Sequence, residues 1–332
     1  MGKDIVCLGI ESTAHTLGIG IVKGREILAN SIDMFQTEEG GMVPSLVAEH
    51  HRKVKYDVLK KALDTAKISM EDVDIISFSR GPGMAPSLVA GMEFAKELAE
   101  KYDIPLVGVN HICAHLEIGR MLTGTKDPIF VFVSGANTQI IAHEGGRYRI
   151  FGETLDIGLG NALDKFGRIA GLGFPAGPKM EKMALEGKYI ELPYVVKGMD
   201  VAFSGINTKA ESLLKKGAKI EDLCYSLQET CFAMLTEVTE RAIAHCQKDE
   251  VILIGGVAAN KRFCKMLDDM CKDRGCKFFP VPLQYCGDQG AMIAWLGILE
   301  YSSRDKLPSI DEIDIDSKWR VDEVETPWID ED

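Results

Sequence analysis

The feature that most constrains the fold is a strand, tight turn, strand pattern that occurs twice along the chain. Residues 5–10 form a short apolar run, a polar turn follows at 11–16, and a second apolar stretch covers 17–22. A similar unit occupies residues 129–143, with its turn at 134–138. Two apolar runs around a short turn predict a β-hairpin, and self-similarity along a chain indicates a duplicated unit. The sequence therefore predicts two related lobes.

Helix and strand patterns alternate after the first predicted hairpin. Helical periodicity is expected at 45–66 and 86–101, and strands at 75–78 and 106–109. The second half repeats this alternation. Its predicted helices lie at 161–171, 221–247, 260–274 and 288–301, and its strands at 251–254 and 277–280. Such alternation is typical of an α/β fold.

The length of 332 residues suffices for two domains of about 100–200 residues each. We expect a first lobe at 1–125, a second lobe at 126–285, and a C-terminal part at 286–332 that returns a helix to the first lobe and ends in an acidic tail. Two facing lobes leave a central cleft, where ligands preferentially bind.

The negative charge is concentrated at the carboxyl end. Residues 311–332 carry −8 of the net charge of −12. An acidic chain seems an unlikely partner for phosphates, but the rest of this chain is nearly balanced. Its densest basic stretch lies on a predicted helix and comprises His50, His51, Arg52, Lys53, Lys55, Lys60 and Lys61. This stretch is either a solvated helix face or a surface that contacts nucleic-acid phosphates.

The cysteines and the apolar runs indicate a cytoplasmic protein. There are nine cysteines and no CxxC pair, whereas a secreted disulfide framework usually has an even set. No apolar run approaches the ~18 residues of a membrane span, and the amino terminus lacks a signal-peptide pattern. We expect reduced thiols and no membrane association.

Two histidines with helical spacing form a candidate metal site. His111 and His115 are four residues apart after a predicted strand, so both imidazoles can reach one ion from the same helix face. Asp288, which lies between Gly287 and the pair Gln289-Gly290, offers a third ligand. Two histidines and a carboxylate suit iron(II) or zinc. Histidines satisfied in a core and an Asp that caps a helix are the alternatives.

Glycine-rich turns form a second candidate site. They lie at 134–138, at intervals between 152 and 177, and at 255–260, where the turn follows a strand and opens a helix. Backbone amides at such junctions can hold phosphate or a nucleoside. Tight turns without a ligand are the alternative. The chain contains neither GxGxxG nor a Walker pattern, which argues against Rossmann and P-loop sites.

Together these motifs identify a family. In order they are GIEST at 9–13, RGPG at 80–83, HICAH at 111–115, VSGANTQ at 133–139, GETLD at 152–156, GGVA at 255–258 and GDQG at 287–290. Over nearly its whole length the chain resembles the TsaD family. It is most similar to the archaeal and eukaryotic branch, whose members are the catalytic subunits of the KEOPS complex.

The resemblance implies an actin-like, sugar-kinase-like (ASKHA) fold and a tRNA N6-adenosine threonylcarbamoyltransferase. Such an enzyme transfers threonylcarbamoyl from its adenylate to N6 of adenosine 37 in tRNAs that read ANN codons. Implied cofactors are one divalent metal, Fe²⁺ or Zn²⁺, held by His111, His115 and Asp288, and an adenine nucleotide (threonylcarbamoyl-AMP, ATP or AMP). The implied nucleotide-binding residues are Phe132, Val133, Ser134, Gly135, Ala136, Asp164, Gly177, Glu181 and Asn260. Implied partners are tRNA, a small kinase-like ATPase and a small dimerising subunit.

The chain departs from the family pattern at three positions. Phe132 stands where many members have a tyrosine that contacts the metal, Ala136 replaces a glycine, and Gln289 replaces an asparagine. Glu11 is a candidate for proton handling or metal support.

Two other functions compete with transfer. A metalloprotease of the HExxH type needs a glutamate inside the motif, and residues 112–114 contain none. A non-catalytic nucleotide-binding scaffold or chaperone-like ATPase shares the fold, but it does not require the two histidines and the aspartate.

Overall fold

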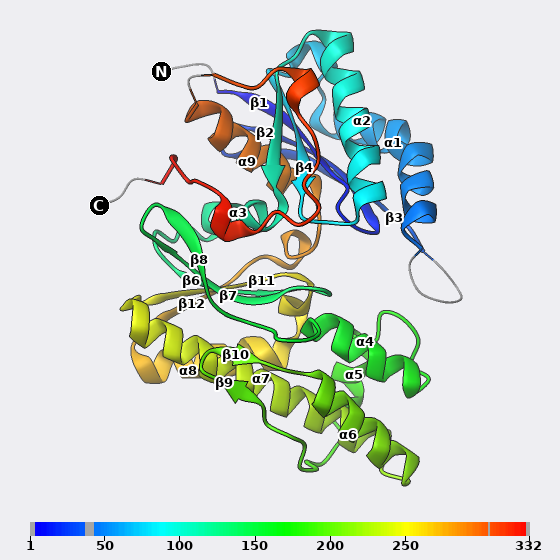
Figure 1. Ribbon diagram of the computed structural model, residues 1–332, viewed down its shortest axis with the longest axis vertical. Helices are drawn as coiled ribbons and strands as arrows, with labels where there is room; N and C mark the ends of the chain where they lie inside the picture. Colours follow the sequence, from blue (N-terminus) through cyan, green and yellow to red (C-terminus); the bar gives the residue numbers. More distant parts are fainter. Residues whose placement is uncertain (1–3, 37–42, 305, 330–332) are drawn as a thin grey trace. The chain divides into compact units, whose positions relative to one another are not determined.

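The computed structural model describes residues 4–36, 43–304 and 306–329 (Figure 1). The chain forms two compact units. Unit 1 comprises residues 1–121, 145–148 and 288–332, and unit 2 comprises residues 122–144 and 149–287. Each is described by itself.

Unit 1 is built on a five-stranded sheet with the order β3-β2-β1-β4-β5. Its strands are β1 (Val6–Glu11), β2 (Thr16–Lys23), β3 (Glu26–Met34), β4 (Ile75–Gly81) and β5 (Leu106–Asn110). β1, β2 and β3 form an antiparallel meander, and β4 and β5 run parallel to β1. The predicted hairpin is therefore present, extended by a third strand. Only Ala29 and Ser31 of β3 are buried, in an irregular pattern without an apolar run, which is why the sequence pattern did not reveal this strand.

Helices cover both faces of this sheet. They are α1 (Pro44–Ala66) and α2 (Ala85–Tyr102) on one face and α9 (Gly290–Ser302) on the other. α3 (His111–Thr123) follows β5, and unit 1 also has the short 3₁₀ turns η1 (Met70–Asp72), η4 (Ile310–Glu312) and η5 (Val321–Glu323). Leu8 and Ile10 of β1 belong to the core cluster that includes α1 and α2. Because side chains alternate along a strand, Gly9 and Glu11 face the other side, where Gly9 lies against α9.

Glycines let α9 approach the sheet directly. A Cβ on Gly9 would lie 2.2 Å from the backbone nitrogen of Ala294, and one on Gly20 would lie 2.0 Å from that of Ala291. Gly9 and Gly20 are register partners in β1 and β2, so they form one flat contact area. This contact fixes the amino end of α9, and with it Asp288, relative to β1.

Unit 2 contains a second five-stranded sheet, with the order β12-β11-β6-β7-β8. Its strands are β6 (Ile129–Val133), β7 (Thr138–Glu144), β8 (Arg147–Glu153), β11 (Glu250–Ile254) and β12 (Lys277–Pro280). β7 is antiparallel to β6, whereas β11 is parallel to both β6 and β12. The strand order and directions match those of unit 1, as a duplicated unit requires.

The helices of unit 2 include three that the sequence predicted and two that it did not. The predicted ones are α4 (Leu159–Ile169), α7 (Ile220–Cys246) and α8 (Lys261–Arg274). The additional ones are α5 (Gly177–Ala184) and α6 (Ser204–Lys215), and two short strands, β9 (Val196–Lys197) and β10 (Asp200–Val201), form a ribbon. The 3₁₀ turns are η2 (Gly256–Ala259) and η3 (Leu283–Tyr285).

The two sheets and their helices confirm the predicted α/β class. Residues 145–148, which the sequence boundaries placed in the second lobe, are grouped with unit 1, because this turn contacts residues near the carboxyl end of the chain. Among the described residues, no helix combines the length and hydrophobicity required to cross a membrane.

Candidate functional site

The candidate metal ligands follow from the topology of the sheet in unit 1. β1, β4 and β5 are parallel, so their carboxyl ends lie at the same edge. Glu11 is the last residue of β1, and His111 directly follows β5 and opens α3. Glu11 at the end of β1 and His111 at the start of α3 therefore lie at the same edge of the sheet.

His111, His115 and Asp288 converge at this edge. The two imidazole centroids lie 4.7 Å apart with their planes 86° to each other, as the four-residue spacing on α3 predicts. Oδ1 of Asp288 lies 3.5 Å from Nε2 of His111 and 3.2 Å from Nε2 of His115. The ligand atoms of all three lie within 4.8 Å of one another. One nitrogen from each ring and one carboxylate oxygen thus face a common point.

Glu11 orients His111 by holding the nitrogen on the far side of its ring. Nδ1 of His111 donates to Oε2 of Glu11 at 2.9 Å. The other oxygen, Oε1, accepts from the backbone nitrogen of Thr13 at 2.7 Å and from its hydroxyl. The Glu11 side chain is fully buried. With the proton on Nδ1, the Nε2 lone pair points toward Asp288, which is the arrangement that metal-binding histidines use.

The electrostatics of the three residues also suit a cation. Burial disfavours the charged form of His111, but Glu11 and Asp288 outweigh burial and raise the pKa of His111 to about 9. Burial lowers the pKa of His115, so this ring is neutral at neutral pH. Burial opposes ionisation of Asp288, yet the two histidines hold the pKa of its carboxyl well below its usual range. A dication can replace the proton of His111 here, because it too balances the buried carboxylates.

Asp288 does not cap α9, which was the alternative role for this residue. Gln289 is the N-cap of α9, and its side chain accepts from the backbone nitrogen of Met292 at 3.1 Å. The Asp288 carboxylate faces the two histidines instead. The donor set of two imidazoles and one carboxylate therefore fits a divalent metal with open coordination positions.

The glycine-rich turns of unit 2 pack against one another. Between β6 and β7, Ser134 and Asn137 close a tight turn through a backbone hydrogen bond of 2.8 Å, and the Ser134 hydroxyl accepts from the Asn137 nitrogen at 3.1 Å. The backbone nitrogens of Gly160 and Asn161, at the start of α4, donate to the carbonyls of Ser134 and Gly135 at 3.1 and 2.9 Å.

Two glycines are required for this packing. A Cβ on Gly158 would lie 2.3 Å from the carbonyl oxygen of Ala136, and one on Gly255 would lie 2.3 Å from that of Val133. Gly255 also has φ of 103°, a conformation that L side chains rarely adopt. The turns that the sequence singled out at 134–138 and 255–260 thus meet at the end of β6.

The other predicted nucleotide-binding residues have structural contacts of their own. Asp164 accepts from the backbone nitrogen of Ala176 at 2.7 Å, and Glu181 accepts from that of Lys261 at 2.7 Å. Burial raises the pKa of Asp164. Gly177 opens α5, and among the described atoms nothing lies within 4 Å of a Cβ placed on it. The backbone at Gly177 is therefore accessible to a ligand.

Asn260 holds the amino end of α8. Its Oδ1 accepts from the backbone nitrogens of Arg262 and Phe263 at 3.0 and 3.1 Å, and its Nδ2 donates to Gln228 at 2.6 Å. Asn260 is thus an N-cap residue, a role that Asn followed by a helical pattern often has. Gln228, which sequence reasoning missed, belongs to the same contact.

Phe132 is fully buried in β6, where its register partners are Gln139 and Ile254. Its ring carries no oxygen or nitrogen, so it cannot supply the metal contact that the resemblance gives to a tyrosine here. Thr13 is a further residue that sequence reasoning did not assign. The spacing of Glu11 and Thr13, which lets a carboxylate accept from the backbone two residues on, was the available signal.

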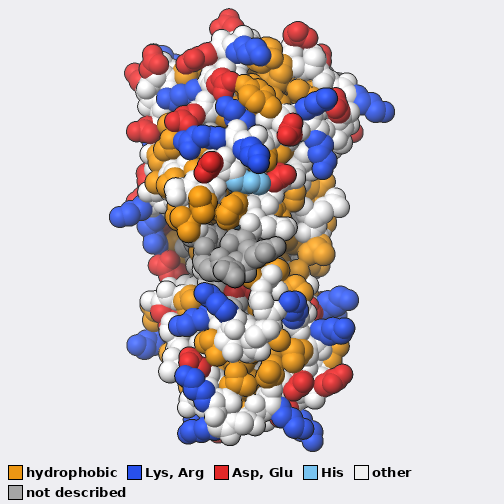
Figure 2. Space-filling model, turned by 90° about the vertical axis from the view of Figure 1, so that its right-hand side faces the viewer, with side chains coloured by type: hydrophobic (Ala, Val, Ile, Leu, Met, Phe, Trp, Pro, Cys, Tyr) orange, Lys and Arg blue, Asp and Glu red, His pale blue; other side chains and the backbone are white. Residues whose placement is uncertain are grey.

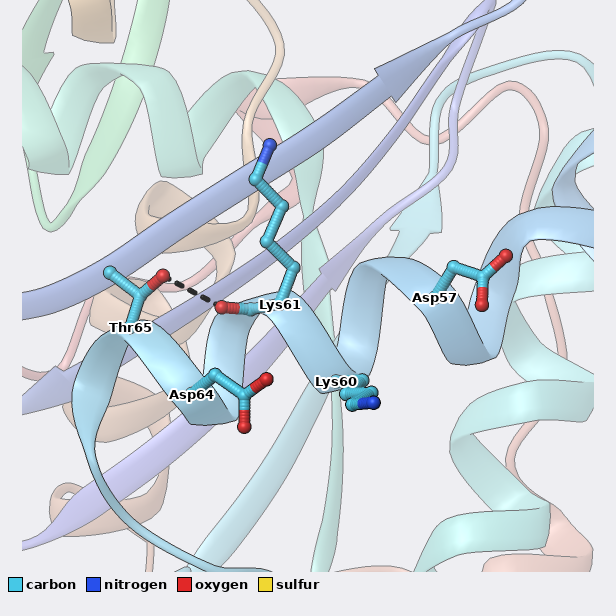
Figure 3. Close-up of a pocket in the computed structure, with 5 residues that line it drawn as sticks. All are labelled: Asp57, Lys60, Lys61, Asp64 and Thr65. Atoms are coloured by element: carbon cyan, nitrogen blue, oxygen red, sulfur yellow. Dashed lines mark hydrogen bonds between the residues drawn. The ribbon is translucent and has the colours of Figure 1, made fainter.

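Three members of the basic stretch on α1, His50, Arg52 and Lys55, pair with acidic groups. Arg52 contacts Glu93 at 3.0 Å, and Lys55 contacts Glu97 at 2.6 Å. Further along α1, Lys60 and Lys61 lie between Asp57 and Asp64, and the four residues line a shallow hollow (Figure 3). His50 pairs with Asp33, and His51 is buried against the carbonyl of Ala14.

The mixed charge of α1 resembles the wider surface. Lys and Arg side chains are interspersed with Asp and Glu over the upper part of the face drawn in Figure 2. These ion pairs favour the interpretation of the basic stretch as a solvated helix face, although Lys53 is exposed.

Solved structures similar to this one share its two-sheet architecture. The full-length HypF structure in the phosphate- and nucleotide-bound form matches 90% of this chain with a TM-score of 0.62 at 12% identity, and 47% of that chain is covered. Component A of the Acidaminococcus fermentans (R)-2-hydroxyglutaryl-CoA dehydratase matches 88% with a TM-score of 0.56 at 15% identity, and 97% of that chain is covered. Fold and site together define an ASKHA-type α/β protein with a two-histidine, one-carboxylate donor set.

Sequence comparison then gives the family. The TsaD model, described as tRNA N6-adenosine threonylcarbamoyltransferase, matches residues 25–295, and the chain belongs to this family. A Thermococcus kodakarensis protein of that description is 56% identical over 98% of this chain and 100% of its own length. A "Probable bifunctional tRNA threonylcarbamoyladenosine biosynthesis protein" of Methanobrevibacter smithii is 50% identical over 98% of this chain and 60% of its own length.

Proposed function

We propose that the chain transfers threonylcarbamoyl from threonylcarbamoyl-AMP to N6 of adenosine 37 in tRNAs that read ANN codons, with a divalent metal bound by His111, His115 and Asp288. The observation that carries this proposal is the convergence of the three ligand atoms within 4.8 Å in a member of a tRNA-modifying transferase family. Fe²⁺ and Zn²⁺ both suit the donor set.

The substrate is already activated, because AMP is a good leaving group on the carbamoyl carbon. The new bond joins N6 of the adenosine to that carbon. The bond from the carbon to the phosphate oxygen breaks, AMP leaves with the electron pair, and N6 loses one proton. The protein must therefore mainly position the amine and stabilise negative charge. A bound metal would supply Lewis acidity for this purpose.

Glu11 acts in this scheme as the residue that positions His111 and fixes its tautomer. Both carboxylate oxygens already accept hydrogen bonds, Oε2 from His111 and Oε1 from Thr13. A general base needs a free lone pair directed at the substrate. The contacts of Glu11 favour metal support over proton handling.

The nucleotide is proposed to bind in unit 2, where residues 132–136 meet the turns at Gly158 and Gly255. The partly accessible backbone of Gly177 and the carboxyl group of Asp164 lie in the segments that follow. Close packing of glycine turns lets backbone amides approach a phosphate or a ribose without steric hindrance.

KEOPS subunits are the proposed partners, including a small kinase-like ATPase and a small dimerising subunit, and the cytoplasm is the proposed location. The bifunctional description of the Methanobrevibacter smithii relative, which is longer than this chain, supports a second activity working beside this one.

Reconstitution tests the proposed function. The purified chain, the partner subunits, threonylcarbamoyl-AMP and tRNA are combined, and digested nucleosides are measured by mass spectrometry. We expect N6-threonylcarbamoyladenosine in tRNAs that read ANN codons and none after chelation of the metal. Product formation that persists in the His111→Ala/Asp288→Ala double variant would overturn the metal-dependent mechanism.

A further inference from the structure

The carboxyl-terminal segment of the described chain, residues 310–329, runs beside α3, the helix that carries both histidines (Figure 1). It is firmly packed within unit 1. Val321, Val324 and Thr326 are no more than 2% exposed. The Thr326 hydroxyl donates to the carbonyl of Gly146 at 2.9 Å. This segment was expected to be an acidic tail, yet its apolar residues are part of the core.

The segment contacts the residue immediately before the first histidine. Asn110 is fully buried, and its Nδ2 donates to the carbonyl of Trp319 at 3.2 Å. Its Oδ1 accepts from the backbone nitrogen of Cys113 at 3.0 Å, in the first turn of α3. Asn110 therefore joins the segment to the amino end of α3.

A second contact lies just beyond the other histidine. Glu117, two residues after His115, is 3% exposed, and its Oε1 accepts from the indole nitrogen of Trp328 at 2.9 Å. The same oxygen accepts from the Tyr148 hydroxyl at 2.6 Å and from Arg120 at 3.1 Å. Removing a hydrogen-bond donor from a buried carboxylate is costly, because it leaves part of the negative charge without compensation.

The two contacts enclose the histidine pair. His111 and His115 occupy the stretch of α3 between Asn110 and Glu117, and each end is attached to the same carboxyl-terminal segment through Trp319 and Trp328. A stretch of helix that is held on both sides of its two histidines has little freedom to rotate or slide. The orientation of both imidazoles depends on that freedom, because they project from its first turns.

We propose that residues 319–328 act as a clamp that positions α3, with Trp328 and Glu117 as positioning residues for the metal ligands. This inference rests on the proposed function where it concerns the metal. The clamp itself concerns the order of α3 and exists without an ion. Neither Trp328 nor Glu117 is proposed to touch the metal or a substrate.

Trp328→Phe in the full-length chain tests the clamp, because it keeps an aromatic ring and removes the indole N–H. Three measurements are made: amide hydrogen exchange of residues 112–119 in metal-free protein, Zn²⁺ affinity by competition with a chromophoric chelator, and the visible spectrum with Co²⁺ bound. We expect roughly tenfold faster exchange and roughly tenfold weaker Zn²⁺ binding, with a changed Co²⁺ spectrum.

Trp295→Phe is the matched control. Trp295 lies on α9 in the same unit and is 8% exposed, and within the described residues its indole nitrogen has no hydrogen-bond partner. Thr326→Val is the second control, because it removes the hydrogen bond of the same segment to Gly146, a residue outside α3. Both controls should match the unchanged chain in all three measurements.

Tyr148→Phe removes another donor from the same Glu117 oxygen and provides an independent test if Trp328→Phe fails to fold. It should shift exchange and Zn²⁺ affinity in the same direction. If neither variant differs from Trp295→Phe, or if Thr326→Val gives equal changes, the clamp is wrong. If the wild-type chain binds no Zn²⁺, the proposed metal function is wrong. Faster exchange in the metal-free variants would still support the clamp.

Discussion

The Glu11 carboxylate and Nδ1 of His111, 100 positions apart in the sequence, form a buried hydrogen bond of 2.9 Å. This bond selects the His111 tautomer with a lone pair on Nε2, the nitrogen nearest Asp288. The pair therefore links a strand end to the helix that carries the metal ligands. It explains why a carboxylate is buried at that position.

Glu11→Gln is expected to weaken metal binding about 10–100-fold without unfolding the chain. Glu11 accepts on one oxygen from Thr13 and on the other from His111, so an amide must turn its NH₂ group toward one of them. If the NH₂ group faces His111, it donates to Nδ1, and the proton of the neutral ring then lies on Nε2. Nε2 then has no lone pair with which to bind the metal. Zn²⁺ competition with a chelator measures the loss. Glu300→Gln, at a buried carboxyl paired with Arg304, is the control. Unaltered Zn²⁺ affinity in Glu11→Gln would contradict this role.

His111→Ala and Asp288→Ala should each remove the metal and abolish transfer while the fold persists. Neither side chain fills a large volume of the core, and Asp288 remains 20% accessible. Elemental analysis measures the metal, and circular dichroism measures the fold. His50→Ala, at a histidine that pairs with Asp33 on α1, should retain both metal and activity. A full metal content in the His111→Ala/Asp288→Ala double variant would exclude this site.

Asp164→Ala and Asn260→Ala should weaken binding of an adenylate analogue more than binding of tRNA. A polar contact to a buried ligand is worth about 1–3 kcal/mol when it is removed. Calorimetry with the analogue and a tRNA gel shift separate the two effects. Glu211→Ala, which removes a surface partner of Lys215, is the control. Equal losses in both assays would place these residues outside the nucleotide site.

The cap role of Asn260 adds a second effect to that experiment. Because its Oδ1 accepts from two amides of α8, Asn260→Ala should also lower the free energy of unfolding by about 0.5–2 kcal/mol. Urea unfolding measures this loss. Asn260→Asp keeps the capping oxygen and loses the donor to Gln228, so it should restore much of the stability.

The sequence predicted those parts of the fold that depend on short-range patterns. The hairpins at β1–β2 and β6–β7 and the long helices α7 and α8 follow from hydrophobic periodicity. β3 escaped detection because its burial pattern is irregular. The role of residues 145–148 could not be predicted either, because it depends on contacts with Glu325 and Thr326, about 180 positions away.

In the candidate site, too, some features have a local sequence signal and others depend on contacts between distant residues. The four-residue spacing of His111 and His115 can be read locally. Asp288 lies 173 positions from His115, so its motif marks it as a candidate ligand but cannot show that it lies beside the histidines. No local pattern shows that Glu11 meets His111 or that Trp328 meets Glu117. The cap at Asn260 has a local signal, an Asn between a strand pattern and a helix pattern. The nucleotide contact that the resemblance implies for Asn260 stays a prediction.

The last prediction concerns how an acidic chain contacts tRNA through the basic stretch of α1. Replacing Arg52, Lys53 and Lys55 by Ala removes three cations, and three lost phosphate contacts would lower the log-log salt slope by roughly three units. Arg52 and Lys55 already pair with Glu93 and Glu97. We therefore expect a fall of about one unit, attributable to exposed Lys53, with the affinity for all tRNAs lowered alike.

The experiment measures tRNA affinity of the assembled complex at several salt concentrations, with and without the triple substitution. Lys265→Ala/Lys272→Ala is the control. It removes two cations of α8 that pair with Asp269 and Asp268, and it should leave the slope unchanged. Adenylate binding should be equal in all variants, because none of the substituted residues belongs to the proposed nucleotide site. A slope that does not change in the triple variant would assign tRNA docking to the partner subunits. A fall of three units would show that tRNA displaces Glu93 and Glu97 from their ion pairs.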